Sequence, residues 1–151
     1  MTDSSVETVM SRGVVTLAPD DTLATASALM VEKGIRHLVI LEKGRVVGVL
    51  SERDLLQRAF ARSVGYTERD RNTLMRSVQA REVVLRAPIT TGPETALSEA
   101  ANLMVEKKIG CLPVVSAGAL VGVVTATDLL RHAGAERPQS QPVAHVPGHL
   151  R

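Results

Sequence analysis

The sequence predicts an α/β (α+β) protein made of two tandem β-α-β-β-α units that pack against each other about a pseudo-twofold axis. One observation is a short apolar run that ends in a hydroxyl residue, with an aspartate three places later; it occurs at residues 48–54 and again at residues 122–128. The second observation is that both copies lie inside a longer repeat with a constant offset of 74 residues, as from Met30 to Met104. A repeat that needs no gap indicates an internal duplication.

Local patterns place the elements of each unit. Short apolar runs bounded by turn residues predict strands, and apolar residues spaced three and four apart predict helices. The first unit is expected to contain strands at residues 14–17, 38–41 and 46–50 and helices at residues 22–33 and 51–61. Asp21 is the expected N-cap of the first helix, Gly34 its C-terminal stop, and Lys43-Gly44 the hairpin turn.

The chain is expected to divide into an N-terminal segment (1–8), a first repeat (9–61), a helical linker (62–82), a second repeat (83–133) and a flexible tail (134–151). The linker has its own helix signal, with Thr67 as the N-cap. Its charges alternate in sign, which indicates a solvated face rather than a nucleic-acid surface. In the tail, His145 and His149 have no cysteine or carboxylate nearby and are expected to face solvent rather than a metal ion.

Three strands and two helices are too few to bury a core, so the units should pack together and bring both hydroxyl-x-x-Asp corners into one central cleft. At each corner the hydroxyl residue takes the N-cap position and the aspartate lies in the first helical turn, where unpaired N–H groups and the helix dipole favour anions. One interpretation is a capping box. The other is a pair of small polar sites for phosphate and sugar hydroxyls.

Composition excludes several classes of protein. One Phe, one Tyr and no Trp leave no stacking platform for single-stranded nucleic acid, and a net charge of +2 gives little general attraction to it. Cys111 is the single cysteine, which excludes a disulfide framework and a cysteine-rich zinc site. No apolar run approaches the roughly 20 residues of a membrane span and no signal peptide is visible. We therefore expect a cytoplasmic protein that engages neither nucleic acid nor membrane.

The duplicated unit resembles the cystathionine-beta-synthase (CBS) domain, and two in tandem resemble a stand-alone Bateman module. The resemblance rests on a proline before the first helix, an Ile-x-x-Leu entry to the second strand and the Gly-h-h-Ser/Thr-x-x-Asp corner, each present twice. It implies a regulatory module that binds an adenosine-containing ligand (AMP, ADP, ATP or S-adenosylmethionine) and modulates a partner protein. The aspartate would accept hydrogen bonds from the ribose hydroxyls, and the Ser/Thr hydroxyl with the helix N-terminus would meet the phosphate.

The resemblance also implies that each ligand site is composite, with the corner of one repeat facing a loop and strand of the other. One implied site joins Val123, Thr125 and Asp128 to Gly13, Ile35 and Arg36. The other joins Val49, Ser51 and Asp54 to Ala87, Ile109 and Gly110. Arg36 and His37 lie at the implied pocket mouth, where a cation would contact phosphate.

Two other functions stay open. The first is a ligand-free dimeric scaffold for protein interaction; the leucines Leu55, Leu56, Leu129 and Leu130 give the terminal helices extra apolar surface and predict a twofold homodimer. The second is an enzyme, since His37 and Cys111 occupy matching repeat positions and could form a Cys–His pair. Matching strand positions are more often core or pocket wall, so we expect no catalytic residue. The sequence shows no other nucleophile beside a base and no metal-ligand cluster, so we also expect no metal ion and no cofactor. The effector protein is not identified by the sequence.

Overall fold

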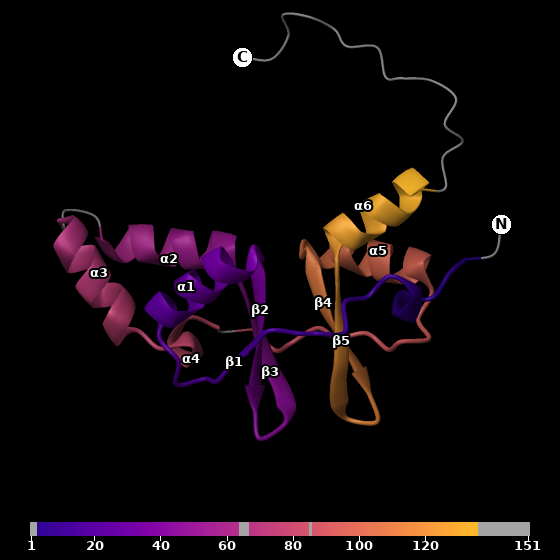
Figure 1. Cartoon of the computed structure of the whole chain (residues 1–151), viewed down its shortest axis with the longest axis horizontal. Coiled ribbons are helices and arrows are strands. Elements are labelled where there is room, and N and C mark those ends of the chain that lie inside the picture. The colour runs from indigo at the N-terminus through magenta and orange to yellow at the C-terminus, as the bar shows by residue number, and fades with distance from the viewer. Residues whose placement is uncertain (1–2, 64–66, 85, 136–151) are drawn as a thin grey trace, which may run out of the picture.

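The structure, a computed structural model, describes residues 3–63, 67–84 and 86–135. It confirms a mixed α and β fold built from two similar units (Figure 1). The elements are η1 (Val6–Thr8), β1 (Thr16–Leu17), α1 (Leu23–Lys33), β2 (His37–Glu42), β3 (Arg45–Ser51), α2 (Glu52–Ser63), α3 (Glu68–Ser77), α4 (Ala80–Val83), α5 (Leu97–Lys107), β4 (Cys111–Ser116), β5 (Ala119–Thr125) and α6 (Ala126–Ala135).

The two sheets differ by one strand. In the first repeat β1 pairs parallel to β2, and β2 pairs antiparallel to β3. In the second repeat β4 and β5 form the hairpin, and the strand matching β1 is reduced to a single bridge between Thr91 and Val114. The expectation of three strands in each unit was therefore wrong for the second. Gly92 follows Thr91 where the first repeat has Ala18, and glycine weakens a strand.

Caps define the helix ends. Gly34 ends α1 in the left-handed conformation, with φ 63°, as predicted. The predicted N-cap was wrong by one residue, because Thr22 Oγ1 accepts the hydrogen bond from Thr25 N at 3.2 Å. The Asp21 carboxylate instead accepts a hydrogen bond from Ala18 N at 2.8 Å and closes the preceding turn. The linker holds two helices rather than one, α3 with the predicted cap at Thr67 and the short α4.

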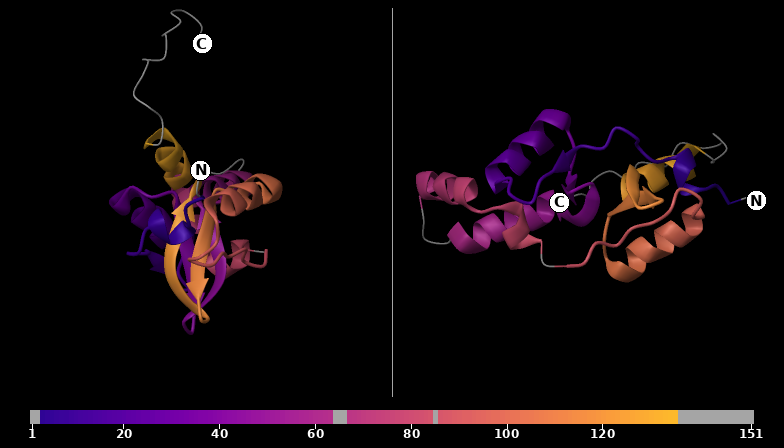
Figure 2. Two further views of the ribbon diagram at one scale, coloured as in Figure 1. Left: turned by 90° about the vertical axis from the view of Figure 1, so that its right-hand side faces the viewer. Right: turned by 90° about the horizontal axis from the view of Figure 1, so that it is seen from below.

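The core of each repeat is completed by the segment of chain that precedes the other repeat. Val6 is buried in the cluster of the second repeat, and Leu97 N donates to Ser4 O at 2.8 Å. Val78 is buried in the cluster of the first repeat, and Leu23 N donates to Val78 O at 2.9 Å. The chain thus crosses twice between the halves, before β1 and after α4 (Figure 2).

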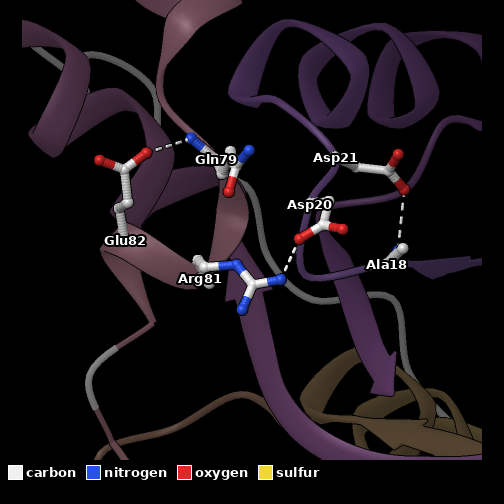
Figure 3. Close-up of polar contacts among 6 residues, drawn as sticks. All are labelled: Ala18, Asp20, Asp21, Gln79, Arg81 and Glu82. Atoms are coloured by element: carbon white, nitrogen blue, oxygen red, sulfur yellow. Dashed lines mark hydrogen bonds and ion pairs between the residues drawn. The ribbon is translucent and has the colours of Figure 1, made fainter. Parts of the chain in front are cut away.

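Polar contacts hold the α4 segment against the first repeat (Figure 3). Arg81 forms an ion pair with Asp20, and Ala80 N donates to Asp21 O at 2.8 Å. Gln79 N donates to the Glu82 carboxylate at 2.6 Å, which caps α4. The first two contacts join residues about 60 positions apart in sequence, as the 61-residue separation of the ion pair shows. The linker therefore completes the packing of the first repeat.

The β2–β3 and β4–β5 hairpins lie side by side at the centre, with β3 against β5 (Figure 1). Glycines let the crossing segments pass over these strands. A Cβ at Gly122 would lie 2.9 Å from Ser11 O and 2.7 Å from Met10 Sδ, and a Cβ at Gly48 would collide with Val84. The glycines that begin each repeated motif are thus needed for close packing of the backbone.

We expect Gly122→Ala to lower the free energy of unfolding by about 1–3 kcal/mol, because a backbone carbonyl cannot move aside as a side chain can. Urea denaturation measures the change. Gly13→Ala is the control, since a Cβ there meets nothing within 4 Å. Equal stability of the two variants would contradict the close approach of the crossing segment.

Candidate functional site

A cavity of about 880 Å³ lies where the two repeats meet. One wall comes from the corner of the first repeat, with Val49, Ser51 and Asp54. The opposite wall comes from the second repeat and the stretch before it, and includes Ala87, Ile109 and Gly110. These six residues were grouped by the resemblance, and the structure brings all six together with His37. We call this space the Asp54 cavity.

The corner of the first repeat follows directly from the end of β3. Ser51 is the last strand residue, and its Oγ accepts a hydrogen bond from Asp54 N at 3.0 Å. Glu52 N donates to Arg36 O at 2.7 Å, which fixes the start of α2 beside the start of β2. Asp54 is exposed, and no described residue donates a hydrogen bond to its carboxylate. That carboxylate can therefore accept hydrogen bonds from a ligand.

The corner of the second repeat has the same backbone but different side-chain bonds. Asp128 accepts hydrogen bonds from Thr125 N at 2.8 Å and from Thr125 Oγ1 at 3.0 Å. Thr125 Oγ1 accepts in turn from Asp128 N at 3.3 Å, which completes a capping box. Neither residue lines the Asp54 cavity. The two corners were expected to share one central cleft, but only the corner of the first repeat lines the Asp54 cavity. The corners also differ chemically, because the Asp128 carboxylate accepts hydrogen bonds from Thr125 whereas the Asp54 carboxylate accepts none from the described residues.

The remaining predicted site residues are distributed around these corners. The backbone of Val123 pairs with that of Ser11, and each N–H donates to the other's carbonyl at 2.9 Å. Ser11 lies two residues before Gly13, so this pairing brings Gly13 near Val123. Ile35 packs half-buried against the core of the first repeat. Arg36 lines a smaller cavity of about 330 Å³ together with Ser51 and Glu52. The structure therefore places Arg36 beside the corner of its own repeat.

His37 and Cys111 both line the Asp54 cavity, but their ionisation does not favour a Cys–His catalytic pair. Burial, with a further contribution from Asp128, raises the pKa of the Cys111 thiol to about 12. Burial also lowers the pKa of His37, although Asp54 acts in the opposite direction. A thiol that stays protonated at neutral pH is a poor nucleophile. The pair is better described as pocket wall.

Sequence reasoning missed four cations that line the Asp54 cavity: Arg53, Arg86, Lys107 and Lys108. They come from three separate stretches of chain, so no local motif connects them. A position-by-position comparison of the two repeats would have given a signal. Lys108 occupies the position of Gly34, and Arg53 that of Thr127.

Membrane-spanning helices and metal clusters are both absent from the described part of the chain. No helix there is both long enough and apolar enough to cross a bilayer. Among the described residues, no three or more His, Cys, Asp or Glu side chains lie close enough together to hold a metal ion. His145 and His149 lie outside the described residues, as does the predicted tail from residue 136 onward.

The family model of the CBS domain matches the chain twice, at residues 6–60 and 80–135, and the chain belongs to this family as a tandem CBS domain protein. A Bacillus subtilis relative, the CBS domain-containing protein YhcV, is 32% identical over 126 residues, which cover 83% of each chain. An inosine-5′-monophosphate dehydrogenase of Korarchaeum cryptofilum is 35% identical over 124 residues, 82% of this chain but 23% of the enzyme.

Solved structures share the fold. One of them is the CBS domain pair of protein MJ0100, which was solved in complex with 5′-methylthioadenosine and S-adenosyl-L-methionine. The two structures superimpose with a TM-score of 0.74 at 22% identity, and the alignment covers 90% of this chain and 100% of the MJ0100 chain. The relatives also differ in length. This chain spans 23% of the dehydrogenase and 32% of a second relative, protein MJ1404 of Methanocaldococcus jannaschii.

Because burial lowers the pKa of His37 in the folded protein, acid should destabilise the fold through this residue. As the pH falls below the ordinary histidine pKa of about 6.5, the unfolded chain binds a proton that the folded chain resists, so the free energy of unfolding decreases. We expect His37→Gln to lose less stability than the wild type between about pH 7.5 and pH 5.5, as measured by urea denaturation. Parallel curves for the two proteins would count against a buried neutral imidazole.

Proposed function

We propose that this chain is a regulatory module that binds an adenosine-containing ligand in the Asp54 cavity and thereby modulates a partner protein. The observation that carries the proposal is a composite cavity, walled by both repeats, that contains an aspartate whose carboxylate accepts no hydrogen bond from the described residues. AMP, ADP, ATP and S-adenosylmethionine are the candidate ligands. The module would act in the cytoplasm and catalyse no reaction itself.

Each part of the cavity suits one part of such a ligand. The Asp54 carboxylate accepts two charge-assisted hydrogen bonds from vicinal ribose hydroxyls. The Ser51 hydroxyl lies at the N-terminus of α2 and can donate to phosphate, while Glu52 N and Asp54 N are already bonded to Arg36 O and Ser51 Oγ. Apolar side chains such as Val49 and Ile109 border the space for the base. The adenosine ligands in the solved MJ0100 pair support the same ligand class.

Ligand binding would regulate because the cavity spans both repeats. A ligand that contacts both walls binds more tightly to one relative placement of the repeats than to others. Its occupancy therefore shifts that placement, and a partner that contacts both repeats senses the change. The match to a limited portion of a longer enzyme is consistent with such a role.

The corner at Asp128 is a second, weaker candidate site. Its carboxylate must give up two hydrogen bonds from Thr125 before it can accept ribose hydroxyls. Each bond to a charged group is worth about 1.5–3 kcal/mol, so this exchange lowers the net gain from a ligand. The resemblance implies Val123, Thr125, Gly13, Ile35 and Arg36 for this site, but the structure places Arg36 beside Ser51 and Glu52 of its own repeat instead.

We expect AMP, ADP or ATP to raise the melting temperature of the wild type, since a ligand at about 100 times its Kd stabilises the folded state by about 2.7 kcal/mol. Asp54→Ala should abolish this effect at the Asp54 cavity. Asp128→Ala is the matched variant and should leave binding at that cavity intact. A thermal shift assay with each nucleotide measures both. Equal shifts for Asp54→Ala and the wild type would refute the role of Asp54.

The alternative function is a ligand-free dimeric scaffold, which the exposed leucines of α2 and α6 favour. Leu56 is 57% exposed and Leu130 is 72% exposed, and they occupy matching positions in the two repeats. Leu55 is buried in the core of the first repeat, and Leu129 packs half-buried against the core of the second. Only Leu56 and Leu130 of the four leucines are therefore fully available for an apolar interface.

We expect the chain to form a twofold homodimer through the surfaces around Leu56 and Leu130, because two matching apolar patches suit a self-complementary interface. Light scattering at tens of micromolar should give twice the chain mass. The double variant Leu56→Gln, Leu130→Gln should give the monomer mass with an unchanged circular dichroism spectrum. A wild-type monomer under these conditions would remove both the dimer and the scaffold function.

A further inference from the structure

The Asp54 cavity carries more positive charge than a nucleoside requires. Four cationic side chains line it, against two carboxylates, so the wall has a net positive charge even when both acids are ionised: the cations are Arg53, Arg86, Lys107 and Lys108, and the acids are Asp54 and Glu106. If the Asp54 carboxylate binds ribose hydroxyls, the cations are left for another part of the ligand. That part must be anionic.

The four cationic residues that line the cavity belong to three separate stretches of chain. Arg53 lies in the first turn of α2, Arg86 in the stretch after α4, and Lys107 and Lys108 at the C-terminal end of α5. All four residues are exposed, and no side chain among them makes a hydrogen bond or ion pair with a described residue. Side chains from both repeats are therefore available to a charged group that extends through the cavity.

Lys108 is an unexpected residue at its position. It ends α5 in the left-handed conformation, with φ 57°, where glycine is comfortable and a side chain is strained. The matching residue in the first repeat is Gly34, with φ 63°. Lys43 and Ala117 adopt the same left-handed conformation in the two hairpin turns, so the conformation alone does not mark a functional residue. Lys108 differs from them because it lines the Asp54 cavity, at the position where the first repeat has glycine.

The duplication supplies an internal comparison for the other three cations. Arg86 and Lys107 match Arg12 and Lys33, so both repeats keep these charges. Arg53 matches the neutral Thr127. The Asp54 cavity therefore has two cations, Arg53 and Lys108, that the matching positions around the Asp128 corner do not supply. By the same matching, Arg36 occupies the position of Gly110, but Arg36 lies beside Ser51 and Glu52 of its own repeat and does not line the Asp54 cavity. Arg53 and Lys108 are therefore the cations that distinguish the Asp54 cavity.

We propose that the Asp54 cavity selects a nucleoside di- or triphosphate over the monophosphate, the free nucleoside and S-adenosylmethionine. The inference rests on the proposed function and specifies its ligand. Cations spread over three stretches of chain match a charge spread along a phosphate chain, whereas a single phosphate reaches fewer of them. The sulfonium of S-adenosylmethionine is itself a cation and is repelled by the same side chains.

Isothermal titration calorimetry of the full chain tests the selection, with adenosine, AMP, ADP, ATP, S-adenosylmethionine and inorganic tripolyphosphate as separate probes. We expect affinity to rise from adenosine to ATP, with a gain of about tenfold or more from AMP to ATP, because each new bond to a charged group adds roughly that factor. The gain should shrink between about 50 and 200 mM salt as exposed charges are screened.

In two variants a cation is replaced by the residue at the matching position of the other repeat, which that position's backbone is known to accommodate. Lys108→Gly and Arg53→Thr should each weaken ATP binding by about tenfold and leave adenosine binding unchanged. Lys108→Gly should also melt at the same temperature as the wild type or higher, since it relieves the left-handed lysine. Lys33→Gln is the matched control, since Lys33 is the counterpart of Lys107 in the first repeat and does not line the Asp54 cavity, and it should leave ATP binding there unchanged.

The outcomes separate this inference from the function on which it rests. Equal affinity for AMP and ATP, or equal losses of adenosine and ATP binding in the two variants, overturns the polyphosphate selection and leaves a nucleotide-binding module. Tight binding of tripolyphosphate with no binding of AMP or adenosine overturns both, because the cavity would then ignore the nucleoside. Absence of binding by every probe also overturns both.

Discussion

The exchange of segments between the repeats is the constraint on which the rest of the structure depends. Each repeat offers one small sheet and two helices, which cannot exclude water from a core by themselves. The chain solves this by covering each core with the segment that precedes the other repeat, through Val6 in one direction and Val78 in the other. Neither half is then independent, and the hairpins β2–β3 and β4–β5 are held side by side (Figure 1).

The same exchange creates the candidate site. To reach the second repeat after covering the first, the chain must cross Gly48 at Val84 and continue through Arg86 and Ala87. This stretch becomes a wall of the Asp54 cavity, opposite the corner of the first repeat. A site built in this way reports on the relative placement of the repeats, because its walls belong to different cores. Regulation by ligand would therefore follow directly from how the fold is completed.

The fold could be predicted because its signal is repeated, whereas the chemistry of the site could not. Two copies at a constant offset left few arrangements to consider. Asp21 and Thr22 are adjacent good N-caps, and only the geometry of the preceding turn decides between them. Similar residues at Asp54 and Asp128 gave no sign that one carboxylate closes a capping box while the other stays open, since that difference depends on rotamer and packing. The cations around the cavity were missed because they converge from distant stretches of chain.

Duplication gives a protein two equivalent sites, and divergence at a few positions is enough to give them different tasks. Here the divergence lies at side chains that do not contribute to either core, such as Arg53 against Thr127 and Lys108 against Gly34. The exposed change of Arg53 against Thr127 costs little stability, since surface substitutions rarely shift it by more than about 0.5 kcal/mol, whereas Lys108 also carries the strain of its left-handed conformation. Such changes can nevertheless alter the charge of a cavity. A tandem module can in this way keep one corner as a structural cap and adapt the other to a charged ligand without any change of fold.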